Sequence, residues 1–212
     1  ISNTEIQNIY SDGAQAFGFL VGGGSSLQFT DTTVSNVLSS GFSVGLGLFS
    51  LTDWAATGAV SYNNGYGVAF ENTSNGTISG SQLYDNEVGV WSGPFTPGTT
   101  TGVINTTIGI WDNSFQGNGD GIVFDTATQH IGMEVRDNLF LGNTGSGISQ
   151  VGYNFTGDLV GNVAIDNHPD FKVDKCIQLF LVNDKAEYIH KSGDERLVEF
   201  TNVSLCKSKS HK

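Results

Sequence analysis

A pattern of asparagine and apolar residues that returns at a near-constant interval constrains this chain more than any other feature. The pattern occurs in Ile108–Ile122 (IGIWDNSFQGNGDGI), Met133–Ile148 (MEVRDNLFLGNTGSGI) and Leu159–Phe171 (LVGNVAIDNHPDF). Each copy has an asparagine, an apolar residue two positions later and a second asparagine three positions after that, followed by a turn and an apolar segment. The equivalent positions are Asn113/Phe115/Asn118, Asn138/Phe140/Asn143 and Asn162/Ala164/Asn167.

A repeat of this length is typical of a solenoid, in which each unit buries its apolar face by stacking on the next unit. The units show the alternation of a strand and not the period of a helix. The sequence therefore predicts an all-β fold, a parallel β-helix of about seven to eight coils over residues 1–171.

The alternation also predicts which side chains point into the coil, because successive residues of a strand point to opposite sides. The expected inward residues are Ile108, Ile110, Phe115 and Ile122, and the expected outward ones are Gly109, Trp111 and Val123. Stacking of the coils then forms two apolar columns, Ile78/Ile110/Val135/Leu159 and Leu83/Phe115/Phe140/Ala164. The repeat asparagines are expected to hydrogen-bond their own kind on adjacent coils, which is a structural role. An insertion, Gly93–Gly102, predicts a projecting loop.

Charge divides the chain into two parts. Residues 1–171 contain fifteen Asp and Glu and a single cation, Arg136, whereas residues 172–212 contain seven Lys and Arg196 against six acids. The second part is predicted to be a C-terminal cap on the open end of the solenoid. The net charge of −12 argues against nucleic acid and anionic membranes as partners. No apolar run is long enough to insert into a membrane, and a chain that opens on Ile1 with no signal-like segment is expected to be processed or trimmed.

Two cysteines and five glycosylation sequons point to a secreted or cell-surface protein. Cys176 and Cys206 flank strand-like segments and predict one disulfide in the cap, with two unpaired buried thiols as the alternative. The sequons lie outside the repeat asparagines, where loops are expected. They are at Asn72, Asn75, Asn105, Asn154 and Asn202.

One outward group of residues has the composition of a binding or catalytic site. Glu134 and Asp158 are expected at the same outward position of adjacent coils, beside a column of Trp111, Arg136 and Val160. Two carboxylates at strand spacing suit the acid and nucleophile of retaining glycoside hydrolysis, with Arg136 beside them. The alternative is an arginine that bridges two surface acids.

Two tryptophans are candidate platforms for a sugar ring. Trp111 lies beside the carboxylate pair, and Trp91 is expected to point outward on another strand, or else to pack under the Gly93–Gly102 loop. His130 and His168 are assigned no role, because neither has a serine or cysteine partner nearby in the expected register.

The repeat over residues 30–171 resembles the right-handed parallel β-helix superfamily, which includes the pectate-lyase-like folds and carbohydrate-associated β-helix modules. The resemblance implies a single-stranded right-handed β-helix in a secreted or surface protein that acts on a polysaccharide or other glycan. The motifs of the polygalacturonase-like and pectin-methylesterase-like members are absent. A uronate lyase needs cations in its groove, and the only Lys or Arg before residue 172 is Arg136. No EF-hand or RTX-type calcium loop is present. No cofactor or metal site is predicted, with calcium bound by stacked Asp left open.

Three functions of different classes remain after these exclusions. The first is a structural, adhesive or polysaccharide-binding surface protein, which the acidity and the missing catalytic motifs favour. The second is a polysaccharide-active enzyme, a glycoside hydrolase or a lyase or epimerase, that uses the outward carboxylates. The third is a subunit that self-associates into an extracellular filament or a viral fibre.

Overall fold

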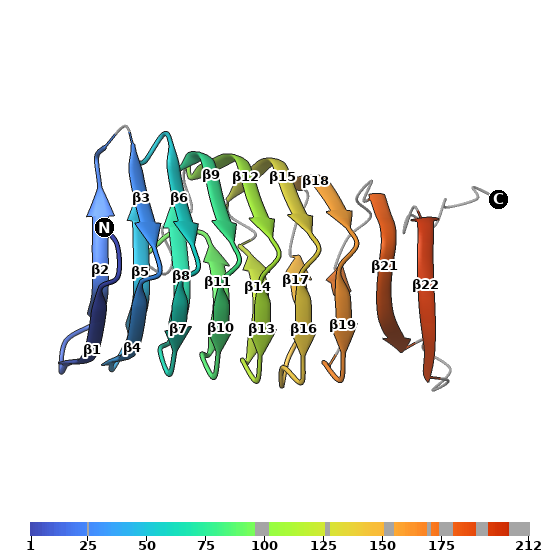
Figure 1. Cartoon of the computed structure of the whole chain (residues 1–212), viewed down its shortest axis with the longest axis horizontal. Coiled ribbons are helices and arrows are strands. Elements are labelled where there is room, and N and C mark those ends of the chain that lie inside the picture. The colour runs from blue at the N-terminus through green and yellow to red at the C-terminus, as the bar shows by residue number, and fades with distance from the viewer. Residues whose placement is uncertain are drawn as a thin grey trace.

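The chain winds into a stack of three-sided coils in the computed structural model, which runs from the N-terminal to the C-terminal end in Figure 1. Residues 1–24, 26–95, 102–125, 128–149 and 155–168 are described in full, and residues 150, 171–173, 180–189 and 195–203 by their backbone alone. These residues form strands and turns and no helix, and therefore none that could span a membrane. Valine, isoleucine and phenylalanine that alternate with small or polar residues favour this strand structure.

Each side of the stack is a face of parallel strands, one strand from each coil. The first face consists of β1 (Glu5–Ser11), β4 (Thr33–Ser39), β7 (Val60–Tyr62), β10 (Gln82–Tyr84), β13 (Ser114–Gln116), β16 (Leu139–Leu141) and β19 (Val163–Ile165). The second consists of β2 (Gln15–Gly22), β5 (Phe42–Phe49), β8 (Tyr66–Glu71), β11 (Val88–Ser92), β14 (Asp120–Phe124), β17 (Ile148–Gln150) and β20 (Phe171–Val173). The third consists of β3 (Leu27–Thr30), β6 (Trp54–Thr57), β9 (Ser74–Ser79), β12 (Ile104–Trp111), β15 (Gln129–Arg136) and β18 (Phe155–Val160).

The described strands make six complete coils and the start of a seventh, fewer than the seven to eight predicted. The predicted number of coils was too high because the period of the last coils does not hold along the whole chain. Side chains that hydrogen-bond between adjacent coils are 28, 27, 22, 32, 25 and 24 residues apart, in order from the N-terminus. The first two coils are long, and the insertion after β11 lengthens the fourth.

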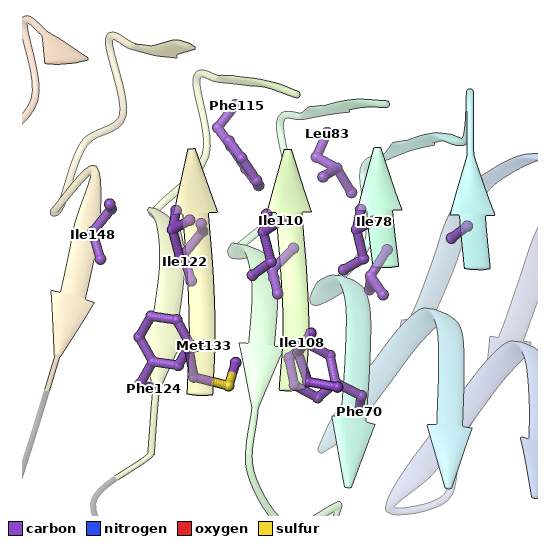
Figure 2. Close-up of a cluster of buried hydrophobic side chains, with 14 of the residues drawn as sticks. Phe70, Ile78, Leu83, Ile108, Ile110, Phe115, Ile122, Phe124, Met133 and Ile148 are labelled. Carbon is purple, nitrogen blue, oxygen red and sulfur yellow. The ribbon is translucent and has the colours of Figure 1, made fainter. Parts of the chain in front are cut away.

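The core is built from apolar columns that run along the stack, as predicted. Phe115 and Phe140 are fully buried, and their rings stack in parallel with centroids 4.8 Å apart. Figure 2 shows Leu83 beside Phe115 and Ile78 beside Ile110, each from an adjacent coil. Burying side chains of this size stabilises a fold by about 1.5–3 kcal/mol each, so the columns supply much of the free energy that holds the coils together.

Asparagine columns connect the coils at both ends of the first face. One runs through Asn113, Asn138 and Asn162, and the other through Asn64, Asn86, Asn118, Asn143 and Asn167, all nearly inaccessible to solvent. Asn138 shows the repeating pattern. Its Oδ1 accepts from the backbone N–H and the side-chain Nδ2 of Asn113, at 3.0 Å each, while its Nδ2 donates to Asn162 and to the carbonyl of Ile110. Backbone groups that a buried corner would leave unpaired are thus satisfied by the next coil, which confirms the predicted role.

A residue with positive φ comes directly before each of these asparagines. Asp112, Asp137 and Gly161 hold this conformation in one column, with φ of 56°, 55° and 67°. Asp, Asn and Gly tolerate the left-handed region better than other residues. The dipeptide of such a residue and asparagine therefore makes the turn and supplies the hydrogen bonds across it.

A column of glycines runs through the strands of the second face. A methyl group on Gly89 would lie 2.6 Å from the carbonyl oxygen of Gly121 and 2.7 Å from the ring of Phe115. The same close approach recurs along the stack, at Gly18, Gly45, Gly67, Gly89 and Gly121. The absent side chains let the backbones of adjacent coils approach each other and leave room for the aromatic column behind them.

The C-terminal strands β21 (Phe180–Ile189) and β22 (Glu195–Val203) continue from the last coil. The first part of β21 pairs in parallel with β18, and its later part pairs in parallel with β19. The strand β22 pairs antiparallel with β21. The two C-terminal strands therefore run side by side in opposite directions. Cys176 and Cys206 lie outside the described residues, so their disulfide and the boundary of the cap stay predictions.

The asparagine columns make a prediction about stability. Asn138→Ala should lower the free energy of unfolding by about 3 kcal/mol or more, because several buried partners lose a hydrogen bond at once. Gln116→Ala on the exposed side of β13 is the control, with an expected change within about 0.5 kcal/mol. Urea denaturation of both variants provides the test. Similar losses from the two changes would contradict the role of the column.

Candidate functional site

The outer surface of the third face brings together the predicted site residues. Glu134 of β15 lies opposite Gly109 of β12 on one side and Asp158 of β18 on the other. Trp111 lies opposite Arg136, and Arg136 lies opposite Val160. The side chains alternate with the buried Ile110, Val135 and Leu159, and therefore point outward. The register predicted from the sequence is the one observed.

The side chains of Trp111, Arg136 and Glu134 lie close together, with Arg136 near both of the others. The guanidinium carbon of Arg136 lies 4.1 Å from the centroid of the Trp111 ring. Nε of Arg136 is 3.9 Å from a carboxylate oxygen of Glu134, and both side chains are more than two-fifths exposed. Solvent screening at this exposure leaves the ion pair worth at most about 1 kcal/mol. The guanidinium of Arg136 thus lies close to both the indole of Trp111 and the carboxylate of Glu134.

A groove of about 320 Å³ lies on the same surface, across strands β9, β12 and β15. Trp111 and Glu134 form part of its wall, together with Asn75, Gly76, Thr77, Thr107, Ile108, Gly109 and Gly132. The indole of Trp111 covers Gly109, where a side chain would collide with it. The volume is at the lower end of the range for ligand pockets, so the groove can hold a small group such as one sugar ring.

The backbone is bent in the same place in all three strands of the groove. Asn75, Thr107 and Gly132 occupy equivalent positions and have φ of 48°, 55° and 66°. Thr107 is β-branched, for which the left-handed region is a genuine outlier. Strained residues of this kind concentrate at functional sites. The alternation of apolar and polar residues does not predict this bend. Gly132 is the one residue in the sequence that could have indicated it.

Trp91 lies on the second face and packs differently from Trp111. Its Nε1 donates to the carbonyl of Pro94 at 3.4 Å, and its ring contacts Tyr66. Phe95 returns over the first coils, with its ring 5.9 Å from that of Phe17. Its N–H donates to Glu71 on the third coil. The predicted projecting loop is therefore wrong for Gly93–Phe95, because Phe95 is 7% exposed. Trp91 thus packs beside the segment that carries Phe95. Of the two candidate tryptophans, Trp111 is the one that lines the groove.

His130 has a serine partner, contrary to the expectation from the sequence. Its Nδ1 lies 3.0 Å from Oγ of Ser92, and its Nε2 lies 3.1 Å from the carbonyl oxygen of Asp125. A carbonyl only accepts, so Nε2 carries the proton and Nδ1 accepts from Ser92. Ser92 in turn accepts from Asn105 at 3.0 Å. Ser92 and His130 are 0% and 2% exposed, so the pair forms an internal polar network out of reach of a substrate.

The buried network makes stability depend on pH. Burial lowers the pKa of His130 from 6.5 to about 4, which outweighs the opposing hydrogen bond to Asp125. The unfolded chain takes up this proton below pH 6.5, whereas the folded chain resists it until about pH 4. The contribution of His130 is therefore fully present above pH 6.5 and is lost as pH falls towards 4, with a total of about 3 kcal/mol.

His130→Gln should remove that part of the pH dependence, because glutamine has no proton to bind in this range. Urea unfolding at several pH values between 4 and 7 measures it as the difference between the original chain and the variant. His168 is exposed, so His168→Gln should leave the dependence as it was. If the difference in unfolding free energy between the original chain and His130→Gln stays constant with pH, His130 is not the group responsible for the pH dependence.

The predicted glycosylation sites fall in different surroundings. Asn72 and Asn75 are exposed, and glycosylation there stays a prediction. Asn105 is 0% exposed, and its amide donates to Ser92 in the interior. A glycan cannot be attached to a side chain buried in this way, so the folded protein does not offer Asn105 as a site. Asn154 and the side chain of Asn202 lie outside the described residues.

The described part of the chain holds no group of three or more His, Cys, Asp or Glu side chains placed to bind a metal ion. Calcium binding remains untested by this observation. Asp112 and Asp137 are neighbours at one corner of the third face, but two side chains do not make a calcium site of 6–8 oxygen ligands.

Comparisons with known proteins agree with the architecture. Residues 1–167 match the family described as the right-handed beta helix region. Searches of the curated proteins and of the solved structures found no match for the chain. The family match covers more than half of the chain, and the stacked parallel strands are the structure that the family name describes. The chain belongs to the right-handed β-helix family.

Proposed function

We propose that this protein binds a polysaccharide along the groove of the third face, with Trp111 as the platform for a sugar ring. The observation that carries the proposal is an outward tryptophan at the wall of a groove large enough for one ring. An indole offers apolar area to the C–H side of a sugar, and hydroxyl and carboxylate groups around it bond the sugar hydroxyls. Thr77, Thr107 and Glu134 are available for these bonds.

Turnover of the bound glycan is a second candidate function. The register that pairs Glu134 with Asp158 favours it, because adjacent strands place α-carbons about 4.8 Å apart. Retaining glycosidases use carboxyl groups at about 5–5.5 Å. In this mechanism one carboxylate attacks the anomeric carbon as the glycosidic C–O bond breaks, and the other group, as the carboxylic acid, gives its proton to the leaving oxygen. Water, deprotonated by that same group, then hydrolyses the glycosyl ester. Release of reducing ends from polysaccharides, lost in both Glu134→Gln and Asp158→Asn, would support turnover.

Secretion is part of the same proposal. A protein at or outside the cell boundary has access to the polysaccharides of cell walls and surfaces. The exposed sequon at Asn72 supports this location, as do the two cysteines of the tail if they pair. Mass spectrometry of the protein from its native source would show both modifications.

Trp111→Ala should weaken binding to a polysaccharide by about 1–2 kcal/mol, roughly tenfold, because the stacked ring contact is lost. Trp111→Phe should retain most of the affinity. Affinity electrophoresis or calorimetry against plant, algal and microbial polysaccharides measures the effect. Tyr10→Ala is the matched control, since Tyr10 is a 74% exposed aromatic on the first coil. Equal effects of the Trp111 and Tyr10 changes would refute the proposed site.

A further inference from the structure

The charge around the groove narrows the class of glycan that it can take. Four acidic residues are neighbours of Trp111 and Arg136 along or across the strands, and one of them, Glu134, lines the groove. Glu134 and Asp158 lie on one side along the strands, and the exposed Asp112 and Asp137 directly follow Trp111 and Arg136 on the other. One guanidinium is thus set against four acids.

The single cation does not offset the acids around it. The guanidinium of Arg136 already faces the indole of Trp111 and the carboxylate of Glu134. The sequence has no other Lys or Arg before residue 172, against fifteen acids before that point. Acids outnumber the one guanidinium on this part of the surface, so a chain of uronates would meet a net repulsive field, whereas a cation would be drawn to the surface.

We infer that the groove binds a polymer of amino sugars with free ammonium groups, of which β-linked glucosamine is the simplest. This inference rests on the proposed function, since it names the ligand class of the same groove. One ring stacks on Trp111, and ammonium groups of the chain donate charge-assisted hydrogen bonds to Glu134 in the groove and to Asp158 on the next strand. The side chain of Glu134 is 46% exposed and remains open to such a donor.

Short oligomers separate charge from ring recognition. A glucosamine tetramer is compared with the N-acetylglucosamine tetramer, which has the same backbone without the charge, and with a galacturonate tetramer. The measurement is calorimetry at a pH at which the amines are protonated, in about 50 and 300 mM salt, which shortens the screening length. We expect the glucosamine tetramer to bind at least tenfold more tightly than the acetylated one at low salt, with a smaller ratio at high salt.

Paired variants test whether the named carboxylates cause the selectivity. Glu134→Gln with Asp158→Asn should reduce the ratio of the two affinities to about one or two. The control is Asp85→Asn with Glu87→Gln, which removes the same two charges at the exposed corner beyond β10, away from the groove. The control should keep the ratio within about twofold of the original. An equal loss of selectivity in the Glu134/Asp158 variant and the Asp85/Glu87 control would show that the overall charge of the protein causes the selectivity. That result would overturn the inference.

The two proposals fail in different ways. Equal binding of the two glucosamine-type tetramers, or preference for galacturonate, with sensitivity to Trp111→Ala, would overturn the charge inference and leave the proposed function standing. Absence of any binding that depends on Trp111, with the tetramers and with the larger polysaccharides, would overturn both.

Discussion

The stack depends on the hydrogen bonds that the buried corner amides exchange between coils. A β-helix turns its backbone twice or more in every coil without water inside to pair the peptide groups. An asparagine at the corner carries a donor and an acceptor side by side, and can repeat the same bonds at every coil. The bonds of Asn113, Asn138 and Asn162 hold the coils in one register. The parallel stack of Phe115 on Phe140 and the outward columns follow from that register.

Because the register is fixed, the outer surface is a regular array on which small irregularities stand out. Most positions of the third face carry residues in ordinary strand conformation. The bend at Asn75, Thr107 and Gly132 is repeated in three coils and opens the groove. Arg136 on the next strand then holds its guanidinium against Trp111. The regular interior and the bent outer surface together form the candidate site. The spacing of the repeat asparagines does not predict the bend.

The sequence predicts what repeats and misses what occurs once. Strand alternation and the spacing of the asparagines were enough to place Phe140 inside and Glu134 opposite Asp158, because each depends on the period alone. The coil number was too high because early coils differ in length. The pairing of Ser92 with His130, 38 residues apart, crosses the insertion, where the period offers no guide. The return of Phe95 over the first coils depends on a tertiary fit between aromatic rings, which a local pattern cannot encode.

Hydrogen exchange of the corner amides tests the central claim most directly. The backbone N–H groups of Asn113, Asn118 and Asn138 donate to the asparagine side chain of the following coil. Although they lie at turns, they should exchange as slowly as the amides of the central strands, since opening them requires the coils to separate. NMR or mass spectrometry with fragmentation resolves these positions. Exchange as fast as that of exposed loops would show that the asparagine columns do not hold the coils together.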